Sequence, residues 1–234
     1  MKNMYVCAKY SWLNFLARYF GGISRFTLPE SNRTTMKKWI SSKHLLVRFA
    51  GLYLMGLIIF TAAWFLSFYL FSEGVMRDTS LASKLAGSDI SADAGREMIR
   101  IFVVNLLMGS FIIGFNYSFR INNLPLGYLI PPIWFLLYGL ILGSNSFTFA
   151  MDERIGPSLA VLQRSGLYEL AAYTLMAVST YNISRFEIKA LFKTNPEKIH
   201  KPVRFNTQQY LGLAVAVLIL FASNYREALM LLNQ

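Results

Sequence analysis

The 234-residue chain is strongly apolar, with 55% hydrophobic and only 15% charged residues, and it carries a formal net charge of +11. Soluble domains are usually about a quarter charged. The charges are also unevenly spread, since residues 49–71, 101–119 and 121–151 contain no ionisable acid or base. These uncharged stretches exclude an ordinary soluble domain and predict a membrane protein.

The first 48 residues hold nine basic residues and one acid. Within them, residues 5–20 mix aromatic residues with scattered cations, which is typical of an amphipathic helix lying in the headgroup layer. A groove on a partner protein would accept the same face. We therefore expect residues 1–48 to form a basic, aromatic N-terminal arm with an interfacial helix, and residues 49–234 to form the transmembrane domain.

Five apolar segments follow, at about 49–71, 99–119, 126–147, 166–183 and 208–226. A helix needs about 20 residues to cross about 30 Å of hydrocarbon. Pro131 and Pro132 fall within the third segment and are expected to bend it, because proline cannot donate a backbone hydrogen bond. The predicted fold is an all-α, polytopic membrane helical bundle of about five transmembrane helices.

The distribution of charge predicts the orientation. Residues 1–48 and 185–204 are rich in Lys and Arg, whereas residues 72–100 and 152–164 together carry seven acids against six basic residues. Because basic loops stay in the cytoplasm, we expect a cytoplasmic N-terminus and an extracytoplasmic C-terminus. Membrane topology and attraction to the lipid bilayer therefore account for the net positive charge. The same pattern argues against binding of nucleic acid.

Amides and small residues occur inside the predicted spans. Amides such as these bond across helices, and small residues let helix backbones approach. We expect packing within one bundle, with a polar path or a homo-oligomer interface as alternatives. The amides are Asn105, Asn116 and Asn145, and the packing glycines are Gly109, Gly114, Gly139, Gly143 and Gly166.

Glu169 lies near the start of the fourth predicted span, where a charge is costly unless it has a partner or a function. Three interpretations remain open. The carboxylate reaches outward or pairs with Arg164 or Arg154, it accepts a hydrogen bond from Asn105 or another amide and so organises the bundle, or it handles a proton or an ion.

Residues with the chemistry of soluble enzymes are scarce. Cys7 is the single cysteine, and His44 and His200 lie in basic stretches without metal-ligand spacing. No Gly-x-Ser-x-Gly sequence and no phosphate-binding glycine-rich loop is present. We expect no enzymatic activity, no cofactor and no metal.

Three short motifs resemble the stage II sporulation protein M family over residues 50–230. They are Arg100-Ile-Phe102-Val-Val-Asn105, the turn at Asn122-Asn123 with the following Leu-Gly127, and Ser165-Gly166-Leu-Tyr-Glu169-Leu-Ala171. Gly166, Glu169 and Ala172 fit the last family motif, but Ser165 stands where that motif usually has His. This departure removes the most readily titrated member of the motif.

The resemblance implies a five-span protein in the plasma (inner) membrane of a prokaryote. The namesake of the family is a membrane anchor that works with peptidoglycan-degrading partners, and some relatives look like permease subunits. Our leading hypothesis is a non-enzymatic scaffold or subunit that assembles with other membrane or envelope proteins. The alternative is a permease-like subunit that works with a separate energising protein.

Overall fold

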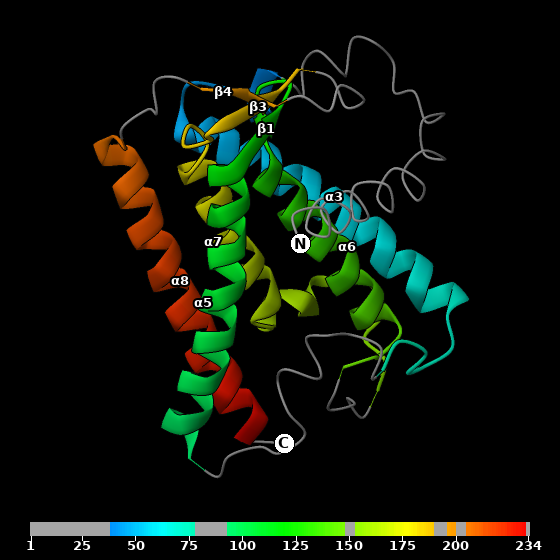
Figure 1. The fold of residues 1–234 in the computed structure, drawn as a ribbon. Helices are drawn as coiled ribbons and strands as arrows, with labels where there is room; N and C mark the ends of the chain where they lie inside the picture. The colour runs from blue at the N-terminus through cyan, green and yellow to red at the C-terminus, as the bar shows by residue number, and fades with distance from the viewer. Residues whose placement is uncertain (1–37, 78–92, 148–152, 190–195, 200–204, 233–234) are drawn as a thin grey trace, which may run out of the picture. The chain divides into compact units, whose positions relative to one another are not determined.

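The computed structural model describes residues 38–77, 93–147, 153–189, 196–199 and 205–232. The predicted interfacial helix at 5–20 lies outside them. The described residues from 39 onward form a helical bundle (Figure 1). Its long elements are α3 (Leu45–Leu70), α5 (Ala94–Ser118), α6 (Ile130–Gly143), α7 (Gly166–Ser179) and α8 (Thr207–Leu232), with 3-10 helices η1 (Leu126–Leu129) and η2 (Leu159–Gln163).

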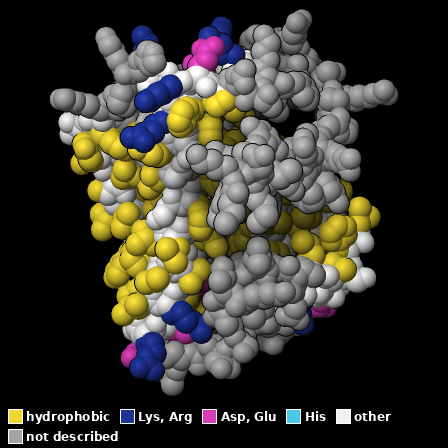
Figure 2. Space-filling view, in the orientation of Figure 1, with side chains coloured by type: hydrophobic (Ala, Val, Ile, Leu, Met, Phe, Trp, Pro, Cys, Tyr) yellow, Lys and Arg dark blue, Asp and Glu magenta, His cyan; other side chains and the backbone are white. Residues whose placement is uncertain are grey.

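Four helical segments are long and apolar enough to cross a membrane: α3, α5, α8 and the continuous run of η1 and α6. This confirms the prediction of an all-α, multi-pass membrane bundle. Their outward faces are apolar, and Figure 2 shows hydrophobic side chains along the exposed middle of the molecule with Lys and Arg gathered at two ends.

The fourth expected span differs from the others. Its helix α7 has 14 residues and is therefore about 21 Å long, too short to cross the hydrocarbon alone. Ten of these residues are buried, so α7 is the enclosed centre of the bundle. It still joins the two ends, because Gln163 just before it meets Arg226 of α8, and Thr180 just after it meets Asn116 of α5.

A small sheet closes the end of the bundle where α5 stops and α8 starts. Its strands are β1 (Phe119–Ile121), β2 (Leu124–Pro125), β3 (Phe186–Ile188) and β4 (Glu197–Lys198), in the order β2-β1-β3-β4. β1 runs parallel to β3, and the other neighbours are antiparallel. Asn122 and Asn123 both have positive φ and form the two-residue turn of the β1–β2 hairpin.

Local sequence explains where two helices begin. The Asp93 carboxylate accepts a hydrogen bond from Gly95 N at 2.9 Å and caps the start of α5. Pro131 and Pro132 lie in the first turn of α6, where the backbone N–H groups have no partner within the helix. The prolines thus begin the α-helical part of the continuous η1–α6 run, and the expected bend there stays a prediction.

The α3–α6 contact depends on the expected Gly-x-x-x-Gly pair. A β-carbon on Gly139 would lie 2.9 Å from Ala63 Cβ, and one on Gly143 would overlap Ser67 Oγ. That hydroxyl donates a hydrogen bond to Gly139 O at 3.1 Å, across the two helices. The glycines thus allow both close packing and an interhelical hydrogen bond.

Arg154 holds the adjoining ends of α3 and α6. Its guanidinium donates hydrogen bonds to Gly143 O at 2.7 Å, Phe68 O at 2.8 Å and Ser67 O at 3.0 Å. Carbonyls in the last turn of a helix have no partner within that helix and carry partial negative charge, so one cation stabilises both helix ends.

Gly114 does not pack as expected. Nothing lies within 4 Å of a β-carbon built on it, and it is exposed on α5. This difference gives a matched pair of glycines. We expect Gly139→Ala to lower the free energy of unfolding by about 1–3 kcal/mol, because the new methyl group meets the α3 backbone.

Gly114→Ala is the control, and it is expected to leave stability unchanged or raise it by up to about 1 kcal/mol through better helix propensity. Thermal unfolding of both variants in the same detergent measures the difference. Equal stability of the two variants would contradict the close α3–α6 approach.

Candidate functional site

Three glutamates come together at one end of the bundle. α5 and α7 begin at this end and α8 finishes there, so Glu97 in the first turn of α5, Glu169 in the first turn of α7 and Glu227 near the end of α8 converge. Glu97 is fully buried, and its carboxylate accepts a hydrogen bond from Arg100 at 2.5 Å. We call these three residues the carboxyl cluster.

Glu169 and Glu227 face each other within the carboxyl cluster, close enough for their side chains to share a hydrogen bond. Glu169 Oε1 is buried without a hydrogen-bond partner. Among the described residues, neither carboxyl group forms an ion pair. Tyr138 of α6 and Tyr173 of α7 lie within electrostatic range of both.

Two facing carboxyl groups repel strongly when both are ionised where water is scarce. This environment differs from two expectations for Glu169. Arg154 is engaged with backbone carbonyls, and Asn105 donates its amide hydrogen bond to Asn224 Oδ1 at 2.9 Å. Arg164 also makes no ion pair with Glu169 among the described residues.

The other expected amides bond elsewhere. Asn116 Nδ2 donates to Thr180 Oγ1 at 2.7 Å and to Ala177 O at 2.9 Å, joining α5 to the end of α7. Asn145 lies beyond the end of α6 with positive φ and donates to Glu73 at 2.5 Å. Asn145 is therefore in a turn, whereas the sequence placed it inside the third span.

An apolar layer separates the two groups of polar contacts. Ile112 lies between Asn105 and Asn116 along α5, and Met176 lies between Glu169 and Thr180 along α7. Both are almost completely buried, as is Leu220 of α8. The described residues therefore place apolar side chains between the two groups of polar contacts, with the buried Thr174 of α7 bonded to Leu170 O of its own helix at 2.7 Å.

Two of the expected packing glycines surround this region. A β-carbon on Gly109 would be 2.5 Å from the Met176 sulfur, so the glycine makes room for the apolar layer. A β-carbon on Gly166 would overlap the ring of Tyr138, so this glycine lets α7 approach α6 beside the carboxyl cluster.

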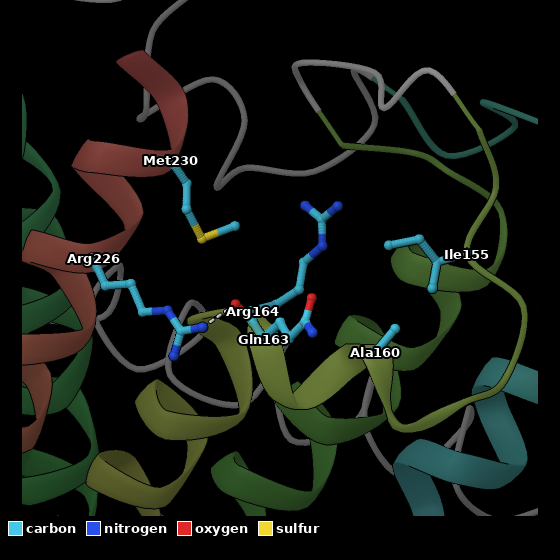
Figure 3. A pocket seen from close by; sticks show the side chains of 6 residues that line it. All are labelled: Ile155, Ala160, Gln163, Arg164, Arg226 and Met230. Carbon is cyan, nitrogen blue, oxygen red and sulfur yellow. Dashed lines mark hydrogen bonds between the residues drawn. The ribbon is translucent and has the colours of Figure 1, made fainter. Parts of the chain in front are cut away.

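A cavity of about 380 Å³ opens near the same end (Figure 3). The Arg226 guanidinium donates a hydrogen bond to Gln163 O and lies over the ring of Tyr168, 5.7 Å from its centroid. The cavity is lined by Ile155, Ala160, Gln163, Arg164, Arg226 and Met230.

Within the described part of the chain, no set of three His, Cys, Asp or Glu side chains is placed to hold a metal ion.

Sequence reasoning missed Glu97, Glu227 and Asn224, although a signal for them was present. The predicted topology places the start of the second span, the start of the fourth and the end of the fifth on the same side. Each of these ends carries a glutamate. Combining topology with charge would have brought the three together, but the pairing of Asn105 with Asn224 depends on helix rotation.

Comparisons with family models, curated proteins and solved structures gave no match to this chain. The function must therefore be argued from the geometry.

Replacing Glu169 with Gln tests the environment of the carboxyl cluster. A Gln amide can donate a hydrogen bond to Glu227 and removes the repulsion that arises when both carboxyl groups are ionised, so we expect stability to rise by about 1 kcal/mol. For a domain of this size that corresponds to about 2–4 °C in Tm. Thermal unfolding in detergent or nanodiscs is the measurement.

Glu197→Gln is the matched control, because Glu197 is exposed and forms a surface ion pair with Lys189. Such pairs contribute little, so its Tm should change by less than about 1 °C. A lower Tm for Glu169→Gln would show that the bundle needs the carboxylate itself.

Proposed function

We propose that this chain is a non-enzymatic integral membrane scaffold, or a subunit of a multi-protein envelope complex. The observation that carries the proposal is the use of intramembrane polar side chains for internal bracing. Asn105 bonds Asn224 between α5 and α8, and Asn116 bonds Thr180 between α5 and the end of α7. The buried apolar layer between these contacts favours a closed body over a conduit.

The surface supports the same proposal. The long helices expose apolar side chains that suit a lipid bilayer, including Leu107 and Phe111 on α5 and Leu218 on α8. We place the protein in the plasma membrane of a prokaryote, with the sheet end in the cytoplasm and the carboxyl cluster toward the outside. The charge distribution along the sequence supports this orientation.

The resemblance to the stage II sporulation protein M family adds support from the Gly166–Glu169–Ala172 motif. In this structure Gly166 makes room for Tyr138, Glu169 enters the carboxyl cluster and Ala172 is fully buried. Gly166 and Ala172 serve the packing of α7, as expected for a motif that maintains an architecture, and Glu169 adds a carboxyl group at the start of the same helix. We therefore propose envelope proteins, including peptidoglycan-degrading ones, as the class of partner.

A permease-like subunit is the second candidate. It is favoured by the unpartnered Oε1 of Glu169 beside Glu227, because a buried acid without a partner marks ion or proton pathways in many membrane proteins. Such a subunit would require a separate energising protein and an opening of the apolar layer around Met176.

The experiment is recovery of the full chain, with a C-terminal tag, from its native membrane in lipid nanodiscs, followed by quantitative mass spectrometry. An unrelated multi-span protein with the same tag provides the background. We expect at least one envelope protein at a stoichiometric ratio to the chain, and an unchanged ratio for Glu169→Gln.

A chain recovered without any stoichiometric partner would contradict the scaffold proposal. Recovery of an ATPase, combined with loss of transport activity in Glu169→Gln, would support the permease alternative instead.

A further inference from the structure

The cavity between η2 and the end of α8 has cationic and apolar walls. Figure 3 shows Arg164 extending into the space between Met230 and Ile155, while Arg226 reaches from α8 toward Gln163. Two guanidinium groups from different elements therefore border one space of about 380 Å³.

The charge of Arg164 is not compensated within the described structure. Its side chain forms no hydrogen bond and no ion pair with any described residue, although it is partly buried. Arg226 donates to one carbonyl, that of Gln163, which does not neutralise it. The nearby carboxyl groups of Glu169 and Glu227 face each other and pair with neither arginine. Arginine in this state is suited to a phosphate group, which accepts two parallel N–H bonds from one guanidinium.

The other wall indicates which molecule carries the phosphate. Ile155, Ala160 and Met230 line the cavity and are apolar, and η2, which supplies Ala160, also exposes Leu159 (82%) and Leu162 (50%). Exposed leucines on η2, which meets the end of the membrane-crossing helix α8 through Gln163 and Arg226, suit the boundary between headgroups and acyl chains. A free phosphate ion would gain nothing from these apolar side chains.

We propose that this cavity binds the headgroup phosphate of an anionic phospholipid. Arg164 and Arg226 contact the phosphate, and an acyl chain lies along Met230 and the leucines of η2. The site goes beyond the scaffold proposal and does not depend on it. It makes a lipid of the outer leaflet part of the assembled protein.

The test is native mass spectrometry of the full-length protein released from nanodiscs that contain phosphatidylglycerol and phosphatidylcholine in equal amounts. We expect one phosphatidylglycerol molecule to be retained preferentially. Arg164→Gln should reduce its retention about tenfold, because one charge-assisted contact to the phosphate is lost.

Ala160→Trp is the second variant, since Ala160 is exposed at the cavity and the indole would fill it without changing any charge. It should abolish retention as well. Arg96→Gln is the matched control: it removes an exposed cation near the start of α5, away from the cavity lining, and retention should be unchanged.

A competition arm separates the two sources of phosphate. Millimolar inorganic phosphate should not displace the lipid. Displacement by inorganic phosphate would overturn the proposal in favour of a soluble-anion site. Equal retention by the wild type, Arg164→Gln and Ala160→Trp would overturn it as well, since the lipid would then bind elsewhere.

Discussion

Polar groups inside the bundle are costly unless they bond within the protein, because hydrocarbon offers no partner. This constraint is most severe for α7, where ten of 14 residues are buried. Its carbonyls near the C-terminal end are met by other elements. Arg48 donates to Val178 O at 3.1 Å and Asn116 to Ala177 O at 2.9 Å. These hydrogen bonds hold α3 and α5 against the end of α7.

An arginine side chain bonds backbone carbonyls at each end of the bundle. At the sheet end, Arg48 is almost completely buried, donates to three backbone carbonyls and lies 4.9 Å from the ring centroid of Tyr181. At the opposite end, Arg154 donates to carbonyls of both α3 and α6. In each case one guanidinium serves several backbone carbonyls, a task that its fork of donors performs better than an ammonium group.

The carboxyl cluster holds one of several buried polar atoms that lack a partner among the described residues; Asn116 Oδ1, Tyr128 Oη and Asn224 Nδ2 are others. Glu97 has Arg100, but Glu169 keeps one buried oxygen without a partner, and it faces another carboxyl group. Ionisable side chains inside membrane proteins commonly mark functional sites. The closed apolar layer around Met176 makes a structural or local use more consistent with the rest of the bundle than passage across it.

Much of the fold can be predicted from the sequence. Bilayer thickness sets the length of a spanning helix, charged residues avoid the hydrocarbon, and glycine spacing marks close helix contacts. The uncharged stretches located α3, α5 and α6, and the Gly139–Gly143 spacing located the close α3–α6 contact. Charge and apolarity cannot distinguish a lipid-facing helix from an enclosed one, so α7 was expected to be a full span.

The candidate site was less accessible from the sequence. Glu169 stood out because it interrupts an apolar run, but its partner Glu227 is 58 positions away on another helix. Which side chains meet across helices depends on rotation and depth, and a single sequence contains neither. Similarly, Pro131 and Pro132 have opposite effects inside a helix and in its first turn, and the pattern alone does not locate the first turn.

Water access to the middle of α7 distinguishes a closed bundle from a conduit. Cys7 is the single cysteine, so Cys7→Ser provides a background for one introduced thiol at Thr174, which is fully buried, or at Gln163, which is exposed at the cavity. A membrane-impermeant thiol reagent is added to intact cells. A closed bundle predicts rapid labelling of Gln163→Cys and none of Thr174→Cys, whereas comparable labelling of both would show a water-filled path through the bundle.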